Sequence, residues 1–230
     1  PKVIVGMTAY NDEGVIGKAV QDFKSNPLVS KVIVVDNNSI DKTFEEAKKA
    51  GAQTVKESVQ GYGACCMRAL KEARKGADIV VLVEGDQTFS STDLKKLLAY
   101  IENADMVVGT RTTTELCAPD SQMNWFMQYG NIFIAKLIQL RYWGKLRLTD
   151  VGCTFRAIRP EALDKIMLLL SVKGNYFSPH MILQALKSDL KVIEVPVTLK
   201  KRAGKSKGVG SSISKGLATG LQMWKEILLS

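Results

Sequence analysis

Two carboxylates stand one residue apart at the point where an apolar run stops. In the segment VVLVEGDQTF, residues 80–89, the aliphatic part ends at Glu84 and Asp86. The run predicts a buried strand, and a carboxylate pair at its end must be solvated, paired or bound to a cation, because uncompensated burial of charge is costly. Such an acid-x-acid turn is typical of sites that hold Mg²⁺ or Mn²⁺ through carboxylates and phosphate oxygens. Acidic turns without a ligand are also common, so the surrounding elements have to be weighed.

The elements before residue 123 alternate between apolar runs and amphipathic segments. Strands are predicted at 2–7, 31–35, 53–56, 78–83 and 105–109, and helices at 14–24, 41–50, 63–75 and 92–102. Continuous Val/Ile runs separated by helices indicate an α/β fold with a parallel sheet covered on both faces. In such sheets the ligand crevice lies beyond the carboxyl ends of the strands. Polar groups follow four of these ends, namely Tyr10–Asp12, Asp36–Ser39, Glu84–Asp86 and Arg111, so we expect them to share one rim.

One of these strand ends and one further turn have a specific chemical interpretation. Asp36 lies too far ahead of the next helix to cap it, which favours a hydrogen bond to a ribose or base edge. The segment QGYGACC, residues 60–66, places two glycines before a helix. It is either an ordinary tight turn or a place where a phosphate or sugar approaches the helix N-terminus. Neither a GxGxxG fingerprint nor a complete P-loop is present, which disfavours a nicotinamide-dependent dehydrogenase and a P-loop site.

The pattern changes from about residue 123. A long apolar helix is predicted at 123–142, followed by a strand at 153–158, helices at 160–170 and 179–188, a strand at 191–199, a basic loop at 200–210 and an amphipathic helix at 211–229. The two apolar helices are interpreted either as core, as surfaces lying in a lipid headgroup interface, or as a dimer contact. We expect residues 1–210 to form one catalytic domain and residues 211–230 a C-terminal amphipathic helix.

The ordered set of motifs resembles the inverting family 2 glycosyltransferases of GT-A fold, across residues 3–207. The matching segments are TAYNDE (8–13), VVDNNSIDKT (34–43), QGYGACCMRAL (60–70), EGDQT (84–88) and VGTR (108–111). Segments 149–163 (TDVGCTFRAIRPEAL) and 201–207 (KRAGKSK) further resemble the dolichyl- or polyprenyl-phosphate sugar synthase branch. The resemblance implies a Rossmann-like sheet, mostly parallel and flanked by helices.

The resemblance also implies a role for individual residues. Nucleotide binding is assigned to Tyr10, Asp12, Asp36 and Gly63; metal binding to Asp86 and Glu84; catalysis to Asp150 and Arg111; and phosphate or acceptor binding to Arg156, Lys205, Ser206 and Lys207. Asp150 would be a general base for a hydroxyl acceptor and an orienting group for a phosphate acceptor. Two departures from the family pattern are Glu84, where the first Asp of DxD stands, and Gln128, where some relatives carry a second arginine for the acceptor phosphate.

The implied partners agree with the composition. The net charge of +9 favours an acidic partner, and the one histidine and four cysteines without a CxxC argue against a structural zinc site. The function implied is transfer of a sugar from a UDP- or GDP-linked donor to a polyprenyl phosphate, with Mg²⁺ or Mn²⁺, on the cytoplasmic face of a membrane. Nucleic acid is not an expected partner, and a homo-oligomer is left open. The alternatives are transfer to a soluble or saccharide hydroxyl, and a non-catalytic nucleotide- or nucleic-acid-binding module.

Overall fold

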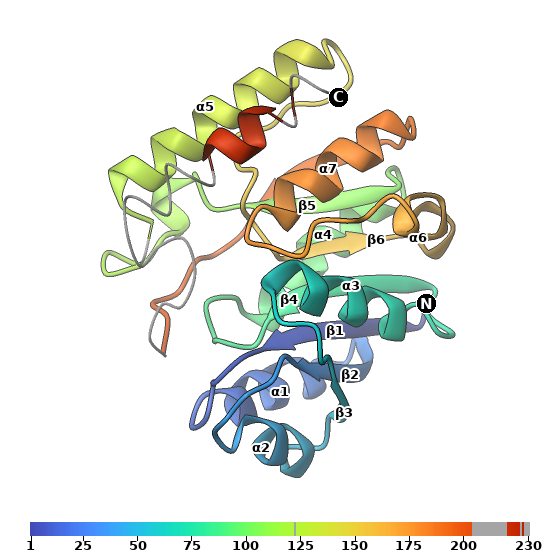
Figure 1. Ribbon diagram of the computed structural model, residues 1–230, viewed down its shortest axis with the longest axis vertical. Helices are drawn as coiled ribbons and strands as arrows, with labels where there is room; N and C mark the ends of the chain where they lie inside the picture. Colours follow the sequence, from blue (N-terminus) through green and yellow to red (C-terminus); the bar gives the residue numbers. More distant parts are fainter. Residues whose placement is uncertain (122, 204–219, 226, 228–230) are drawn as a thin grey trace.

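The computed structural model describes residues 1–121, 123–203, 220–225 and 227. Its centre is a seven-stranded sheet of order β3-β2-β1-β4-β6-β5-β7 (Figure 1). The strands are β1 (Val3–Ala9), β2 (Val29–Asp36), β3 (Gln53–Lys56), β4 (Ile79–Glu84), β5 (Met106–Thr110), β6 (Arg156–Ile158) and β7 (Val192–Pro196). The α-helices are α1 (Ile16–Lys24), α2 (Thr43–Lys49), α3 (Tyr62–Ala73), α4 (Leu94–Ile101), α5 (Trp125–Arg141), α6 (Pro160–Met167) and α7 (Phe177–Lys187), and short 3-10 turns lie at Ser91–Asp93 and Thr114–Leu116.

The sheet is mostly parallel, as predicted. β2 and β4 pair in parallel with β1, β3 with β2, and β7 with β5. The exception is β6, which runs antiparallel between β4 and β5. The carboxyl ends of β1, β2, β4 and β5 therefore lie along the same edge of the sheet, which is where the polar motifs were expected.

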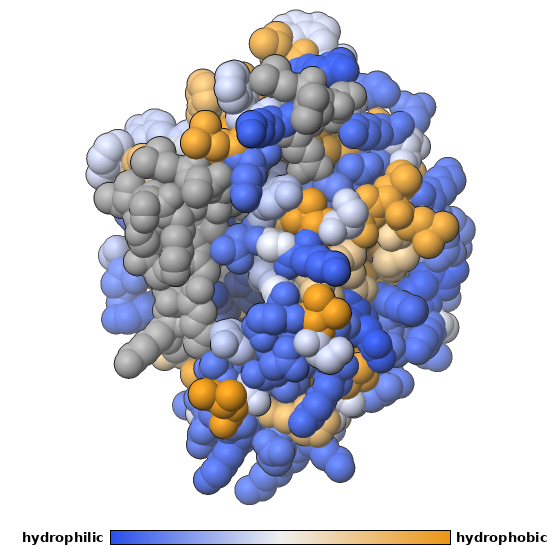
Figure 2. Space-filling model, in the orientation of Figure 1, coloured by the Kyte–Doolittle hydropathy of each residue, from blue (hydrophilic) through white to orange (hydrophobic). Residues whose placement is uncertain are grey.

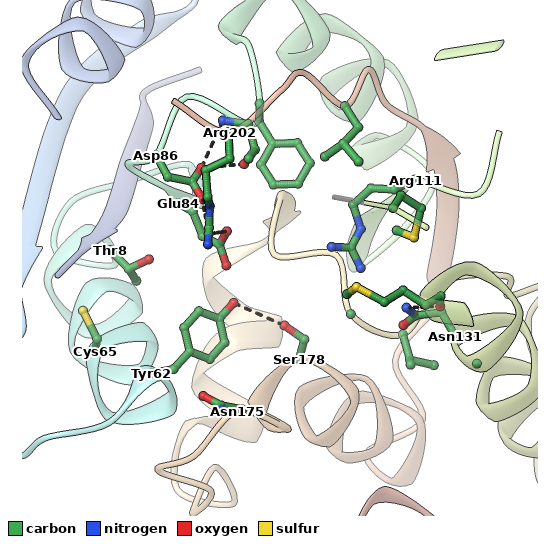
Figure 3. Close-up of a pocket in the computed structure, with 18 of the residues that line it drawn as sticks. Thr8, Tyr62, Cys65, Glu84, Asp86, Arg111, Asn131, Asn175, Ser178 and Arg202 are labelled. Atoms are coloured by element: carbon green, nitrogen blue, oxygen red, sulfur yellow. Dashed lines mark hydrogen bonds and ion pairs between the residues drawn. The ribbon is translucent and has the colours of Figure 1, made fainter. Parts of the chain in front are cut away.

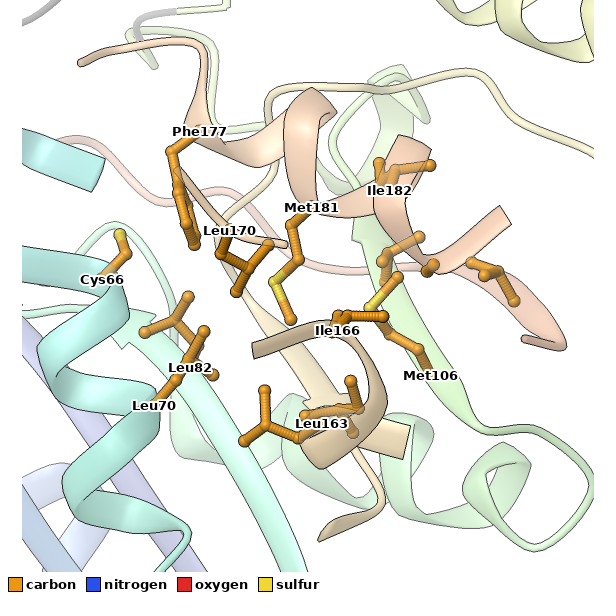
Figure 4. Close-up of a cluster of buried hydrophobic side chains, with 14 of the residues drawn as sticks. Cys66, Leu70, Leu82, Met106, Leu163, Ile166, Leu170, Phe177, Met181 and Ile182 are labelled. Atoms are coloured by element: carbon orange, nitrogen blue, oxygen red, sulfur yellow. The ribbon is translucent and has the colours of Figure 1, made fainter. Parts of the chain in front are cut away.

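Helices cover both faces of the sheet because the side chains on both faces of its central strands are apolar. In β1, Ile4 faces a core formed with α3, α6, α7 and part of α5, whereas Val3 and Val5 face a second core formed with α1, α2 and α4. Figure 4 shows the first core, where Leu82 of β4 lies between Leu70 of α3 and the side chains of α6 and α7. Two apolar faces per strand explain the continuous Val/Ile runs.

The second half of the chain supplies the wall beside this sheet. Helix α5 is capped by Asn124, whose side-chain oxygen accepts a hydrogen bond from the Met127 N–H at 2.9 Å. The predicted strand at 191–199 is shorter in the structure, because β7 ends at Pro196, a residue that has no N–H to donate. Residues 220–225 and 227 are helical, and Ile227 is buried in the first core. The rest of the predicted 211–229 helix lies outside the described residues, and the division at residue 210 stays a prediction.

Candidate active site

One cavity of about 840 Å³ opens at the carboxyl edge of the sheet. The predicted rim residues Tyr10, Asp12, Glu84, Asp86 and Arg111 all line it. Side chains at or just after the ends of three separate strands thus meet around one space, which Figure 3 shows from inside. The expectation that these strand ends share a rim is confirmed for these five residues.

The two carboxylates of the acidic pair, Glu84 and Asp86, form ion pairs with an arginine of the same chain. Arg202 donates from Nε to Asp86 Oδ2 at 2.6 Å, and its Nη2 contacts both Asp86 Oδ2 and Glu84 Oε2, the latter at 3.3 Å (Figure 3). The other Asp86 oxygen accepts the Thr88 N–H at 3.0 Å and the Thr88 hydroxyl at 2.5 Å. The pair is therefore partnered, and Arg202 is a site residue that was not expected from the sequence.

Glu84 has an unusual proton affinity for a glutamate. Burial and then the charge of Asp86 raise the pKa of Glu84 to about 7, although Arg202 acts in the opposite direction. Its Oε1 accepts a hydrogen bond from the Thr154 hydroxyl at 2.9 Å, and Thr154 in turn pairs with the Tyr62 hydroxyl. The two hydroxyls connect the β4 turn to the first turn of α3 and fix the direction of the Glu84 side chain.

Arg111 and Asp150 form a second, separate ion pair. Arg111 Nε and Nη2 donate to the two Asp150 oxygens at 2.7 and 2.9 Å, and the Arg111 N–H and Gly152 N–H also donate to this carboxylate. Burial alone would raise the pKa of Asp150, but the charge of Arg111 and the hydrogen bonds from Arg111 and Gly152 together outweigh burial, and the pKa is lowered. Asp150 is buried and does not line the cavity, whereas Arg111 does. This geometry makes Asp150 a support for Arg111.

Glu194 holds the turn that carries Asp150. Its carboxylate accepts the Asp150 N–H at 2.8 Å, the Thr149 N–H at 2.9 Å and the Thr149 hydroxyl at 2.9 Å. Burial raises the pKa of Glu194 in spite of these bonds. The sequence contained a signal for this residue, since an acid in the apolar strand KVIEVPV requires buried partners.

Two of the residues that were predicted to bind the nucleotide, Asp36 and Gly63, differ in their surroundings. Asp36 is buried at the end of β2, and among the described residues its Oδ1 has no hydrogen-bond partner. An unpaired buried acceptor is costly, so this oxygen suits a donor. Asp36 itself is not among the residues that line the cavity, although the next residue, Asn37, is. Gly63 is placed differently from its prediction: its N–H donates to the Lys173 carbonyl at 2.8 Å, and that amide is not available to a phosphate. Gly61 and Tyr62 line the cavity instead.

Arg156 is a correction. Its side chain is 0% exposed, and its guanidinium donates to the carbonyls of Thr154, Ser178 and Cys153. Burial of a charge requires such partners, so the donors of Arg156 are used inside the protein and its predicted role in phosphate or acceptor binding is wrong. Lys205, Ser206 and Lys207 lie outside the described residues.

The far wall of the cavity is apolar. It includes Phe126, Met127 and Phe133 of α5 together with Leu221 and Trp224 of the C-terminal segment. Gln128, which stands where some relatives were expected to carry an arginine, donates to the Thr112 carbonyl at 3.0 Å. A polar end and an apolar wall therefore belong to the same cavity.

The protein side chains at this site could supply only some of the ligands that a divalent cation needs. In the part of the chain that the structure describes, no cluster of three or more His, Cys, Asp or Glu side chains could hold a metal ion. Glu84 and Asp86 nevertheless converge on one positive group, and Mg²⁺ commonly takes one or two carboxylates with the remaining ligands from water and phosphate. The two carboxylates fit a metal that is completed by a substrate diphosphate.

The mostly parallel sheet with paired carboxylates at its carboxyl edge is that of a glycosyltransferase of GT-A fold, a class shown by the family that the sequence matches. The chain belongs to glycosyl transferase family 2, whose family model matches residues 4–167. It is 28% identical to the dolichyl-phosphate hexose transferase of Haloferax volcanii, over 93% of this chain and 91% of that protein. It is also 28% identical to the undecaprenyl-phosphate mannosyltransferase of Micrococcus luteus, over 94% and 91% respectively.

Two further proteins are similar over different shares of their length. The low-salt glycan biosynthesis hexosyltransferase Agl6 of Haloferax volcanii is 27% identical over 90% of this chain, which spans only 49% of that protein. Glucosyl-3-phosphoglycerate synthase from Mycobacterium tuberculosis, crystallised with Mn²⁺, UDP-glucose and phosphoglyceric acid, matches with a TM-score of 0.74 and 17% identity, over 99% of this chain and 78% of that one. At that identity the likeness supports the fold alone.

Proposed function

We propose that this chain transfers a sugar, with inversion, from a UDP- or GDP-linked donor to a polyprenyl phosphate. The observation that carries the proposal is a cavity in which a polar, sheet-edge end adjoins an apolar wall from α5 and residues 220–224. The two relatives named for dolichyl and undecaprenyl phosphate transfer, which match nearly the full length of this chain, support a lipid phosphate acceptor.

The polar end would bind the donor. Tyr10 and Asp12 line the cavity beside β1, and the unpaired Asp36 oxygen lies at the end of β2, so these residues would hold the nucleoside. Glu84 and Asp86 would hold Mg²⁺ or Mn²⁺, which supplies positive charge to the donor diphosphate. Lys205, Ser206 and Lys207 stay assigned to phosphate binding as a prediction from sequence.

The chemistry needs charge stabilisation more than proton removal. An acceptor phosphate oxygen forms a bond to the anomeric carbon as the bond from that carbon to the donor diphosphate breaks. The acceptor is already an anion, so a strong general base is unnecessary. Asp150, whose pKa is lowered and whose oxygens are bonded to Arg111, suits a positioning role, and Arg111 would place its charge on a phosphate in the cavity.

A membrane surface is the expected place of action. No helix within the described ranges has both the length and the hydrophobicity to cross a bilayer. Several aromatic side chains on and just after α5 are exposed, among them Trp125, Tyr129 and Trp143. Figure 2 shows orange and pale residues at the α5 end and a further group of orange residues at the right, over the α6 region, whereas most of the visible face is hydrophilic. Such a surface would lie in a headgroup interface on the cytoplasmic side.

The test is a transfer assay with purified protein. UDP- and GDP-linked hexoses are offered with Mn²⁺ and either a polyprenyl phosphate in detergent or a soluble acceptor such as 3-phosphoglycerate. We expect metal-dependent transfer to the lipid, and a loss of about 100-fold or more in Asp86→Asn, because an amide cannot supply the charge that holds the cation.

The controls separate site chemistry from folding. Glu84→Asp should keep activity, since it restores the commoner acidic pair. Asp164→Asn, which breaks an exposed pair with Arg74, should behave like wild type. Transfer to the soluble acceptor alone would contradict the lipid assignment, and normal activity of Asp86→Asn at low Mn²⁺ would contradict the metal site.

A further inference from the structure

Arg202 contacts one carboxylate oxygen of Glu84 and one of Asp86, and these are the oxygens that would be available to a metal ion. Glu84 Oε1 accepts from Thr154, and Asp86 Oδ1 accepts from Thr88. The remaining oxygen of each residue, Glu84 Oε2 and Asp86 Oδ2, contacts the Arg202 guanidinium. Each carboxylate thus has one oxygen bonded to a threonine and one oxygen bonded to Arg202.

The backbone on either side of Arg202 is held by the same turn. The Lys200 N–H donates to the Thr88 carbonyl at 2.9 Å, and the Ala203 N–H lies 3.4 Å from the Asp86 carbonyl. Further back, the Leu199 N–H donates to the Leu116 carbonyl at 2.9 Å. These bonds keep residues 199–203 in register with the Asp86 turn and direct the guanidinium at the acidic pair, as Figure 3 shows.

A divalent cation and the Arg202 guanidinium would bind the same two carboxylate oxygens. Oxygens are the ligands of Mg²⁺ and Mn²⁺, and the two oxygens that point into the cavity already carry a positive partner. A guanidinium and a divalent ion at the same two oxygens would repel each other in a partly buried site, where such interactions are stronger than in water. Occupation by one therefore requires that the other leave.

We propose that Arg202 is a resident cation that competes with the metal for Glu84 Oε2 and Asp86 Oδ2. The inference rests on the proposed function only in taking the acidic pair as the metal site. In the donor-free protein Arg202 offsets part of the negative charge of the pair and lowers its affinity for the metal. A donor diphosphate favours the exchange, because it offers oxygens to the metal and an anionic partner to the released guanidinium.

The first test measures Mn²⁺ binding without any donor, by isothermal titration calorimetry. Arg202→Ala should bind Mn²⁺ about tenfold or more tightly than wild type, because the charged hydrogen bonds that have to break are removed. Arg202→Lys should fall between them, since an ammonium cannot bond both carboxylates through a planar fork. Lys201→Ala is the matched control: its side chain forms an exposed pair with Asp120, and its Mn²⁺ affinity should equal wild type.

A second measurement guards against a folding artefact. In EDTA the Arg202→Ala variant should melt below wild type, because the two carboxylates lose their cation. Added Mn²⁺ should then raise the Tm of Arg202→Ala more than it raises the Tm of wild type, since tighter binding to the folded state stabilises it more. The Arg202→Lys protein, which keeps a charge, provides the same comparison if the alanine variant does not fold.

The outcomes distinguish this inference from the proposed function. Equal Mn²⁺ affinity in wild type, Arg202→Ala and Arg202→Lys, including no binding by any, would overturn the competition, even if wild type transfers sugar. Tighter binding by Arg202→Ala would support it even if wild type transferred no sugar to a polyprenyl phosphate, in which case the proposed acceptor alone would fall.

Discussion

The carboxylates around the cavity differ in chemistry because their partners differ. Glu84, next to Asp86, has a pKa raised to about 7, whereas Asp150, bonded to Arg111, has a lowered pKa. Asp36 keeps an unpaired buried oxygen. Residue type alone would treat these acids as equivalent, but Glu84 contacts the guanidinium of Arg202, Asp150 supports Arg111, and Asp36 keeps an acceptor for a donor.

The Arg111–Asp150 pair predicts a pH dependence of stability. The folded pKa of Asp150 lies below its ordinary value, so its charge stabilises the fold at pH values above that ordinary value, about 4. This contribution is lost as the pH falls through the folded pKa. Asp150→Asn should therefore be less stable than wild type by about 3 kcal/mol near neutral pH, and the difference should shrink in acid below about pH 4.

Urea unfolding at a series of pH values measures this difference. Asp120→Asn, which breaks the exposed pair with Lys201, is the control and should differ little from wild type at any pH. A stability difference for Asp150→Asn that stayed constant down to the lowest accessible pH would show that the carboxylate charge is not what stabilises the pair.

Among the secondary-structure elements, the first turn of α3 depends on a close backbone contact. A Cβ at Gly63 would lie 2.1 Å from the Val172 carbonyl oxygen, so the glycine lets the 172–173 segment pack against the helix. This segment leads to Asn175, which lines the cavity. Gly61, just before α3, makes a similar contact, since its added Cβ would lie 2.3 Å from the Lys173 carbonyl oxygen. Both glycines therefore serve packing, and Gly61 also lines the cavity.

Gly63→Ala should destabilise the protein by about 1–3 kcal/mol, because the backbone at 172–173 would have to move. Gly17→Ala is the matched control within α1: no atom lies within 4 Å of its added Cβ, and the change should stabilise the helix by about 0.5–1 kcal/mol. Chemical denaturation measures both. Equal stability of Gly63→Ala and wild type would mean that the 172–173 segment shifts without cost.

Over the molecule as a whole, the apolar surface is unevenly placed. Trp125 is 72% exposed and Trp143 is 80% exposed, near opposite ends of α5, and Trp224 lies across the cavity from the sheet edge. The whole chain carries a net charge of +9, and we expect the exposed aromatic residues of α5 to face an anionic membrane surface. The same surface would place the apolar wall of the cavity beside the lipid.

Vesicle sedimentation tests this arrangement. Anionic vesicles should pull down the protein at low salt and release much of it at high salt, because exposed charges are screened over about 10 Å at 0.1 M ionic strength. The double change Trp125→Ser and Trp143→Ser should reduce the fraction that resists salt. Leu168→Ser, at a residue that is 94% exposed beyond the end of α6, should not. Loss of the salt-resistant fraction in Leu168→Ser alone would contradict an α5 membrane face.

Most of the elements of the described residues, the mostly parallel sheet and the edge where the polar motifs gather could be predicted from the amino-acid sequence, whereas the antiparallel direction of β6 could not. These features follow from local properties: periodicity distinguishes strand from helix, and the carboxyl ends of parallel strands must share an edge. The side chains of Tyr10, Asp12, Asp86 and Arg111 could therefore be assigned to that edge from sequence alone.

Which charges meet, in contrast, depends on tertiary packing. Arg202 reaches Asp86 across 116 residues of chain, and Glu194 reaches Asp150 across 44. Arg156, chemically as able to bind phosphate as Arg202, instead points into the core, where backbone carbonyls take its donors. Such pairings depend on how distant segments pack and on which polar groups packing leaves buried, and no local sequence pattern encodes either.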